Sequence, residues 1–480
     1  MEESQFKNRE EIVKEIKSRH LILMPDGKEI SLDLSKPDEV KKILHEIGDE
    51  EIKAYILSEE IKGQPKKEPP SIKAMQRLEL VDYESSSDSG NLRFYPKGNL
   101  FFELLKDWAD EIALNRLGSM KIVSPILYNW ADKEIQEQAS SFHERHYIVK
   151  VPDDKNKEFI LRFAGDFGLF KIMKKANFSY RMLPLRMYEF SKSFRYEQSG
   201  ELAGLKRVRA MHIPDIHCFC KDLSQGWQEY QHLYKNYVDL ANGAGVKYAI
   251  GFRIVEDFYK EHKERIVELL QYSKRPAFIE VMSKMKHYWV VKNEFQGIDS
   301  VGGNSQLSTV QLDVKDAKVY GINYIDSDGS KKGCIICHSS IGSLERWMYS
   351  ILEEALKKER PMLPVWLSPS QLRLIPVSEQ HLEYCKSLKF NNVRVDIDDS
   401  NDSLGKKIAK AHKEWIPYVA VVGSKEIESN KLMVNFREDG SKAELSSDNL
   451  EKEIHEKCKG LPFRQLPVPK LLSQRPIFFG

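Results

Sequence analysis

The sequence predicts a multidomain protein of mixed α+β and α/β class, and three observations lead to this prediction. The chain has 480 residues, enough for two or three domains of about 100–200 residues each. Breaks rich in proline occur at 63–70 and 361–364. After the second break, strand and helix patterns alternate, which is typical of a compact, partly parallel α/β domain. We therefore expect a small N-terminal appendage with its linker over residues 1–75, a central α+β domain over 76–361 and a C-terminal α/β domain over 362–480.

Composition excludes several classes of protein. A hydrophobic content of 41% and a charged content of 30% are typical of a soluble globular protein. The chain has no run of about 18 apolar residues, and its acidic, polar N-terminus does not resemble a signal peptide. Six cysteines are too few for a disulfide framework. We expect a cytoplasmic protein with reduced thiols and no membrane partner, whereas the net charge of +2 neither requires nor excludes a nucleic acid.

The order of elements follows from hydrophobic spacing and turn residues. In the N-terminal part we expect two strands and two helices, at 21–24, 30–34, 40–47 and 51–61. From Asn99, apolar residues recur at helical spacing, and this helix leads into a short strand that ends at Pro125. Further strands of the central domain are expected at 146–152, 158–163, 308–313 and 335–338.

The stretch Phe194–Cys220 predicts a hairpin with cations near its tip. Arg195 and Glu197 lie on the outgoing strand, and Arg207 follows a turn of small residues. Guanidinium groups match phosphate oxygens in pairs, so this hairpin suits a polyphosphate. A solvated basic hairpin is the alternative if the stretch is taken alone.

Two other segments carry polar side chains among apolar residues. Gln306 and Gln311 lie in a strand pattern, and Arg346 lies in the first turn of a helix, where the dipole favours an anion. Burying such groups costs several kcal/mol unless each is paired. Together with the hairpin they predict a polar pocket on a sheet, although each alone would also fit a surface salt bridge.

These segments resemble the motifs of class II aminoacyl-tRNA synthetases. FRYE at 194–197 with Arg207 resembles motif 2, GSLER at 342–346 resembles motif 3, and the helix and strand that end at Pro125 match motif 1, the dimer-interface element. LPLRMYEF, SGELAGLKRVRA, DIHCFC, STVQLD and GSLERW are similar to the threonyl-tRNA synthetase family, most closely its archaeal branch, and PYVAVVGSKEIES is similar to its anticodon-binding domain. The resemblance covers residues 76–480 and implies an antiparallel catalytic sheet flanked by helices, in a homodimer.

The resemblance also implies an activity and its ATP site. Threonine and ATP, bound with Mg²⁺, would give threonyl-adenylate and pyrophosphate, and tRNA(Thr) would then take the acyl group. Arg195 would hold the α-phosphate, Glu197 would read the adenine amino group, and Arg207 and Arg346 would bind the terminal phosphates; the implied catalytic residues are Arg195, Glu197 and Arg346. Met211 stands where the family usually has a phenylalanine against adenine, which is a tolerable apolar replacement.

Four residues are implied around the two substrates. Gln306 would contact ATP, and Gln311 would contact threonine. Trp289 takes the place of a family tyrosine that contacts the substrate, and Asp215 would accept from the hydroxyl or amine of threonine. Valine has nearly the shape of threonine, and only a site that binds the hydroxyl rejects it strongly.

The family reads that hydroxyl with zinc held by one cysteine and two histidines, and this sequence departs from the pattern. The cysteine position falls on Asp166, the central histidine matches His217, and the third ligand falls on Cys337 or, one residue later, on His338. Carboxylate, imidazole and thiolate all bind zinc, so we expect a retained metal. The alternative is a lost metal and a buried His217 that is only hydrogen-bonded. Only one of Cys337 and His338 can face the pocket from a strand.

Three functional features are less well defined. Gln138 aligns loosely with a histidine that assists transfer in relatives, with His143 close to it. Only 62 residues precede the linker, too few for the editing domain of most relatives, so we expect no editing of seryl-tRNA in cis and a separate editing protein. Lys406, Lys407 and Lys410 form a candidate tRNA patch, for which a solvated helix face is the alternative.

Two other functions stay open from the sequence. One is an inactive synthetase paralogue that serves as a regulatory or binding module, against which the retained cations argue. The other is an ATP-dependent ligase that acts on an acceptor other than tRNA. The resemblance of the C-terminal domain to an anticodon-binding domain argues against it.

Overall fold

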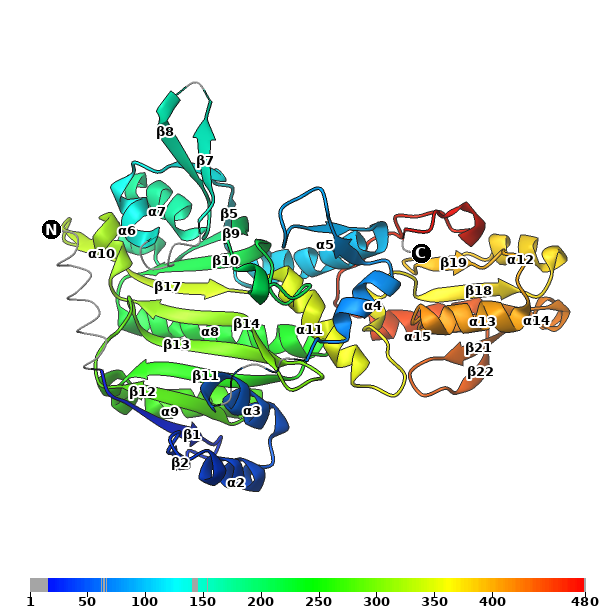
Figure 1. Cartoon of the computed structure of the whole chain (residues 1–480), viewed down its shortest axis with the longest axis horizontal. Coiled ribbons are helices and arrows are strands. Elements are labelled where there is room, and N and C mark those ends of the chain that lie inside the picture. Colours follow the sequence, from blue (N-terminus) through cyan, green and yellow to red (C-terminus); the bar gives the residue numbers. More distant parts are fainter. Residues whose placement is uncertain are drawn as a thin grey trace.

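The computed structural model describes residues 16–61, 63, 65, 67–139, 146–152 and 154–478. Figure 1 shows a large lobe built on one broad sheet and a smaller lobe beside it that holds the C-terminal part of the chain. Within the described residues, no helix combines the length and the apolar character that crossing a membrane requires.

A ten-stranded sheet organises the large lobe. In spatial order its strands are β2 (Glu29–Leu32), β1 (Ser18–Leu23), β12 (Ala277–Met282), β11 (Tyr248–Val255), β13 (Trp289–Ile298), β14 (Asn304–Asp313), β17 (Ile335–Ser340), β10 (Ala210–Cys220), β9 (Leu185–Phe194) and β5 (Met120–Ile122). Neighbouring strands run antiparallel, except for the parallel pairs β11–β12 and β5–β9. The antiparallel sheet expected from the sequence is confirmed.

Helices cover both faces of this sheet. Tyr230 in the long helix α8 shares an apolar core with the strand residues Val310 and Leu312. The helices that contribute to this core include α4 (Ser71–Arg77), α5 (Pro96–Asp110), α8 (Leu223–Gly243), α9 (Glu256–Ser273) and α11 (Leu344–Leu356). The opposite face carries α3 (Glu50–Tyr55), α7 (Asp166–Lys175) and α10 (Asp316–Tyr320). This second face is the one on which the polar side chains of the site lie.

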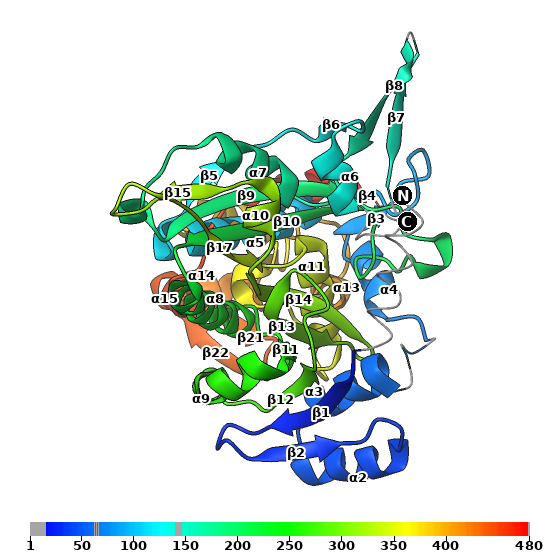
Figure 2. The ribbon, with the colours of Figure 1, turned by 90° about the vertical axis from the view of Figure 1, so that its left-hand side faces the viewer.

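The helix expected from Asn99 is α5, and it begins at Pro96, where proline suits the first helical turn. It continues through the π-helical turn η2 (Glu111–Arg116) into β5, the edge strand beside β9. The strands β6 (Leu127–Asn129), β8 (Asp154–Leu161) and β7 (Ile148–Val151) form a small sheet, and its hairpin projects from the large lobe (Figure 2). The smaller elements of this lobe are α4 (Ser71–Arg77), β3 (Val81–Tyr83), β4 (Leu92–Phe94), α6 (Lys133–Ala139), β15 (Asn323–Ile325) and β16 (Lys331–Gly333).

The N-terminal strands and helices occur where we expect them, but they are continuous with the large sheet. β1 pairs with β12 along its length, so that Leu21 lies opposite Ile279. The helix α2 (Pro37–Ile47), α3 and the turn η1 (Ile56–Ile61) share a core with Ala249 and Phe278 of the sheet. A division at residue 75 misses this continuity, because the pairing joins segments far apart in sequence.

The smaller lobe is an α/β unit, as the alternating pattern predicts. Its sheet has the order β19 (Val395–Ile397), β18 (Leu372–Pro376), β20 (Tyr418–Val422), β21 (Leu432–Phe436), β22 (Lys442–Leu445). Its helices are α12 (Leu382–Ser387), α13 (Leu404–Lys413), α14 (Ser424–Ser429) and α15 (Ser447–Lys457). Lys407 is buried and its Nζ donates to the backbone oxygen of Asp398, so the three lysines of α13 do not form one exposed patch.

Candidate active site

Strand register brings two rows of polar side chains onto the face of the sheet opposite α8. Directly paired residues of neighbouring strands point to the same face. One row consists of Lys292, Gln311, His338 and His217, and the next consists of Glu294, Thr309, Ser340 and Asp215. We call these eight residues the polar floor. Four neighbouring strands, β13, β14, β17 and β10, therefore build one site.

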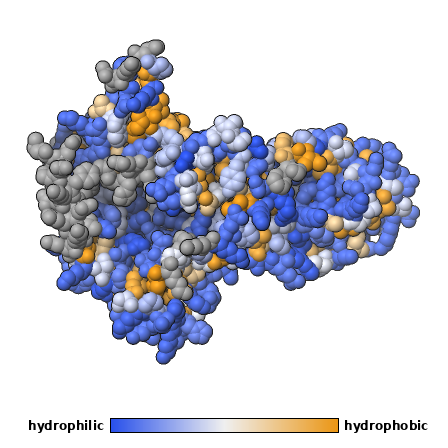
Figure 3. All heavy atoms as spheres, in the orientation of Figure 1, coloured by the Kyte–Doolittle hydropathy of each residue, from blue (hydrophilic) through white to orange (hydrophobic). Residues whose placement is uncertain are grey.

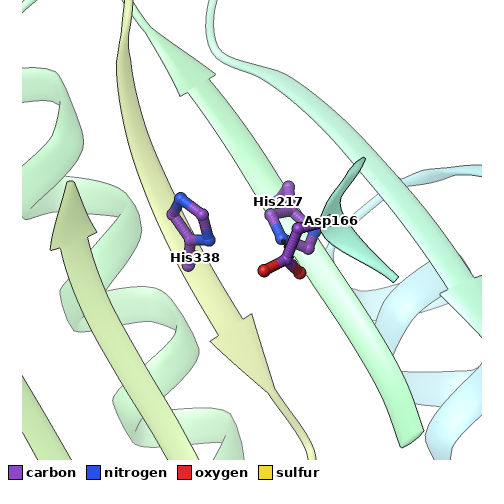
Figure 4. A group of neighbouring side chains, drawn as sticks. All are labelled: Asp166, His217 and His338. Carbon is purple, nitrogen blue, oxygen red and sulfur yellow. Dashed lines mark ion pairs between the residues drawn. The ribbon is translucent and has the colours of Figure 1, made fainter. Parts of the chain in front are cut away.

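At one end of the polar floor, Asp166 meets His217 and His338 (Figure 4). Asp166 begins α7, and its Oδ1 lies 3.2 Å from Nε2 of His217. The candidate ligand atoms of the three residues all lie within 4.8 Å of one another. Two imidazoles and one carboxylate are donors that zinc accepts, so the donor set fits the metal expected from the sequence.

Cys337, the first choice for the third ligand, lies on the other face of the sheet. It is paired with Cys218 across the β10–β17 ladder and is fully buried in the apolar core that α8 helps to form. Neighbouring residues of a strand alternate between faces, so only His338 can reach Asp166. The choice of Cys337 is therefore corrected to its alternative, His338.

Carboxylates stand behind the imidazole of His338. Its Nε2 lies 2.7 Å from Oδ2 of Asp313, and Asp316 completes a second group of three possible ligand atoms. Burial alone would lower the pKa of His338, but the hydrogen bond and charge of Asp313 raise it to about 9. Burial opposes ionisation of Asp166, yet the hydrogen bond with His217 lowers the pKa of Asp166 to about 2. The pocket thus holds Asp166 as an ionised carboxylate, and the contact with Asp313 fixes the orientation of His338.

The residues implied for threonine border this group. Asp215 is buried, and Ser191 Oγ donates to its Oδ2 at 3.3 Å. Burial, reinforced by the charge of Asp166, raises the pKa of Asp215 well above its usual range. Gln311 Oε1 accepts a hydrogen bond from the hydroxyl of Tyr288 at 2.9 Å. Trp289 is buried and pairs across the strands with Asp313.

At the other end of the site, three guanidinium groups lie near one another. Burial and then repulsion from Arg195 and Arg207 lower the pKa of Arg346 to about 10. Glu197 is buried, and its Oε2 lies 2.9 Å from an NH of Arg207. Met211 lies on the neighbouring strand β10 and is buried. Cations concentrated in this way suit a polyphosphate.

The loop before α11 places Arg346. Gly342 has a φ of 101°, and an added Cβ there would lie 2.7 Å from the backbone oxygen of Leu307, so only glycine fits. Ser343 caps the helix by accepting from the backbone NH of Arg346. The guanidinium then donates to the backbone oxygen of Gln306 at 3.3 Å, so the contact with Gln306 is through its backbone.

The structure places Gln138, a candidate from the sequence, and adds Lys292, which sequence reasoning missed. Gln138 donates to Oδ2 of Asp166 at 3.4 Å and accepts from Tyr320 at 2.5 Å, whereas His143 lies outside the described residues. Lys292 enters the polar floor with its Nζ 2.6 Å from Oε1 of Glu294. The alternating polar residues of β13 are the sequence signal for Lys292, but they do not tell which face is the pocket.

Comparison with known proteins agrees with this geometry. A model described as the tRNA synthetase class II core domain (G, H, P, S and T) matches residues 147–355, and one described as the anticodon binding domain matches 371–457. The threonine–tRNA ligase of Thermococcus gammatolerans is 42% identical and covers 97% of this chain and 75% of its own length. That of Pyrococcus horikoshii has the same identity and coverage. The chain belongs to the threonyl-tRNA synthetase family.

Solved structures show how widely this synthetase shares its fold. The RNA-binding domain of threonyl-tRNA synthetase from Cryptosporidium parvum superposes with a TM-score of 0.69 at 23% identity, over 82% of this chain and 99% of that one. Prolyl-tRNA synthetase of the same organism, with halofuginone and AMPPNP, gives a TM-score of 0.65 at 16% identity, over 80% and 76% of the two chains. In this synthetase the class II core match runs from β7 to α11 and so includes the polar floor and Arg346.

Proposed function

We propose that this synthetase activates threonine with ATP and transfers it to tRNA(Thr). The observation that carries the proposal is the union, on one sheet face, of a guanidinium cluster with the Asp166–His217–His338 group. In the first step a carboxylate oxygen of threonine attacks the α-phosphorus, and the bond to pyrophosphate breaks. In the second a terminal ribose hydroxyl of the tRNA attacks the carbonyl carbon, and AMP leaves.

The cations bind and polarise ATP. Arg195 holds the α-phosphate and stabilises the charge that develops there during in-line attack. Arg207 and Arg346 hold the terminal phosphates together with Mg²⁺. Glu197, which faces Arg207 in this structure, reads the adenine amino group, and Met211 packs against the base. The closeness of the three guanidinium groups supports these roles, because their mutual repulsion is relieved when an anion lies between them.

Asp166, His217 and His338 would hold zinc. When bound, zinc would supply a Lewis acid for the amine and hydroxyl of threonine. Asp215 and Gln311 contact the same substrate groups. Valine has no hydroxyl, so bound valine would leave the buried donors and acceptors of the site without a hydrogen-bond partner.

The anticodon of tRNA(Thr) is expected to dock on the smaller lobe. A groove of about 570 Å³ lies there between α13 and the sheet strands β20–β22, and cations, an aromatic ring and an amide line it. The residues that offer such contacts are Arg360, His412, Asn435, Phe436, Arg437 and Lys442. Arginine and aromatic side chains bind phosphates and unstacked bases.

A homodimer is expected to form through the motif 1 region. Val123 is 88% exposed and Met120 is 49% exposed at the edge strand β5, and Ile126 and Leu127 follow with 42% each. Figure 3 shows a further apolar area on the nearby hairpin of β7 and β8. Clustered apolar residues on an unpaired sheet edge support an interface between copies of the chain.

Serine differs from threonine by one methyl group, which a pocket distinguishes by only about 1–3 kcal/mol. We therefore expect these 480 residues to mischarge serine and to depend on an editing protein in trans. The test of the whole proposal is aminoacylation of a tRNA(Thr) transcript by the purified chain. Threonyl-tRNA should form, and seryl-tRNA supplied separately should persist. An inactive paralogue would form neither product, and hydrolysis of seryl-tRNA by the chain alone would overturn the editing part.

A further inference from the structure

The N-terminal segment Glu50–Ile61 forms a side wall of the polar floor. It consists of α3 and η1, which pack on the substrate face of the sheet. The fit is close at Gly251, where an added Cβ would lie 2.7 Å from the hydroxyl of Tyr55. Gly251 is paired across the strands with Glu294, a residue of the floor itself.

A chain of hydrogen bonds leads from this wall into the floor. Ser58 Oγ donates to Asn304 Oδ1 at 2.7 Å, and Asn304 Nδ2 donates to Gln296 Oε1 at 3.0 Å. Gln296 Nε2 then donates to Glu294 Oε2 at 3.1 Å. The other oxygen of Glu294 lies 2.6 Å from Nζ of Lys292. Each amide accepts on one side and donates on the other, so the ionised carboxylate of Glu294, which can only accept, fixes the direction of the chain. Ser58 is the donor at its far end, and its Oγ also lies 3.2 Å from the backbone oxygen of Tyr55.

The residues of this hydrogen-bond chain are buried, so each depends on its protein partners. Ser58, Asn304, Gln296 and Glu294 are each 3–6% exposed, so water cannot replace a missing partner. A buried polar group that loses its partner is destabilised, because the free energy of removing it from water is no longer offset by a hydrogen bond. Asn304 Nδ2 also donates to Oε2 of Glu59 at 3.2 Å, which keeps the amide from turning over. Removal of the hydroxyl takes one donor from Asn304 Oδ1, so the amide would shift and the change would pass to Gln296.

The wall has a second anchor, Glu60, whose partner Arg253 acts by its charge on the carboxylate of Glu294. Glu60 Oε1 lies 2.9 Å from an NH of Arg253, and Arg253 also pairs with Glu280. Burial opposes the charge of Glu294, but the charges of Lys292 and Arg253 lower its pKa. Glu294 is thus an ionised group held between the wall and the ammonium of Lys292.

We propose that the N-terminal segment is a working part of the amino-acid pocket. Ser58 and Asn304 are positioning residues that act through Gln296 and Glu294 to hold the Lys292 ammonium beside Gln311. Lys292 lies in the row of His217 and His338, so a shift of its Nζ alters the charge that the threonine carboxylate meets. The proposal rests on the threonine activation proposed above, but the hydrogen-bond chain can be tested separately.

The experiment compares Ser58→Ala and Ser58→Thr in the full chain, with Ser31→Ala as a control on the exposed part of β2. In threonine-dependent ATP–pyrophosphate exchange, Ser58→Ala should raise the KM for threonine about 3- to 10-fold, the effect of one lost hydrogen bond. The KM for ATP should stay within about twofold, because Arg195 and Arg346 lie outside the hydrogen-bond chain. Ser58→Thr, which keeps the hydroxyl, should restore the KM for threonine, and Ser31→Ala should match the wild type.

Hydrogen exchange of the backbone amides of β13 is the second measurement, and it needs no activity. Ser58→Ala should speed exchange in Lys292–Gln296 relative to the wild type and to Ser31→Ala. If the wild type shows no threonine-dependent exchange with pyrophosphate, the proposed function fails while the amide measurement still decides the linkage. Unchanged amide exchange in β13, or equal increases in the KM for threonine and for ATP, would overturn the inference.

Discussion

The Nε2 atom of His338 lies 2.7 Å from Oδ2 of Asp313, and both side chains are buried. A carboxylate behind a ligand imidazole fixes the tautomer and the ring orientation and makes the other nitrogen a better ligand. Asp313 would thus orient His338 as a metal ligand beside Asp166 and His217. This contact links the strand β14 to the candidate metal group on β17 and β10.

Asp313→Asn should weaken zinc binding by about 10- to 100-fold, the usual effect of losing such a partner. Competition with a chromophoric chelator measures this affinity directly. Asp328→Asn is a suitable control, because Asp328 is an exposed aspartate of the β15–β16 turn. An affinity for zinc equal to that of the wild type would show that Asp313 does not orient a ligand.

Asp166→Ala should bring the zinc content of protein purified in metal-free buffers well below one per chain, because only two imidazoles then remain in the group. It should also reduce the discrimination of threonine over valine by at least about tenfold, since recognition of the hydroxyl carries that discrimination. Asp166→Cys keeps a zinc ligand and should retain the metal. Elemental analysis and exchange kinetics measure the two effects. Wild-type protein without zinc would contradict the metal assignment itself.

Arg346→Ala should lower kcat/KM for threonine activation by about 10²–10³, as expected for a group that stabilises charge in the transition state. The comparison is Arg265→Ala, which removes an exposed cation from α9. ATP–pyrophosphate exchange gives the rates, and thermal unfolding confirms that both variants are folded. A loss of similar size in the two variants would exclude a specific role for Arg346.

Val123→Glu should convert the proposed dimer into a monomer, because it places a charge at a position that is 88% exposed beside the edge strand β5. Val377→Glu is the matched control, since Val377 is 49% exposed and directly follows β18, which Figure 1 shows in the smaller lobe, away from β5. Analytical ultracentrifugation measures the mass. The assignment of this surface fails if Val123→Glu sediments as a dimer.

Asp396→Asn should destabilise the smaller lobe by about 3–5 kcal/mol, the usual cost of breaking a buried ion pair on one side. Asp396 and Arg373 are both 0% exposed, with Nε and Oδ1 2.8 Å apart. Burial opposes the charge, but Arg373 holds the pKa of Asp396 well below its usual range. Because the pKa of Asp396 is lower in the folded state, its ionised form stabilises the folded protein at pH values above the unfolded pKa of about 3.9. This stabilisation is lost as the pH falls from that value toward the folded pKa. Urea unfolding should therefore show the full difference in the free energy of unfolding between the wild type and Asp396→Asn at pH 7, and a smaller difference below about pH 4.

The sequence predicts most of the architecture because its signals are local. Helical spacing finds α5 and α11, and alternating strands and helices identify the smaller lobe. The union of β1 with β12 is not predictable in this way, because no local pattern names the partner of a strand. The N-terminal part is therefore read from the sequence as an appendage, although its strands extend the catalytic sheet.

The site shows the same limit. Motif residues such as Arg195, Arg346 and His217 can be placed from the sequence, whereas Cys337 and His338 differ by one position and lie on opposite faces. One residue of register reverses the face of every side chain in a strand. The roles of Asp313 and Lys292 depend on pairing across β13, β14 and β17, which only the structure supplies.

The most direct test of the central claim is ATP–pyrophosphate exchange by the purified full chain with threonine, serine and valine in parallel. We predict exchange with threonine, weaker exchange with serine, and valine rejected by at least about 10³ in kcat/KM, because the site is built to bind a hydroxyl. No threonine-dependent exchange, or equal use of valine and threonine, would contradict the account.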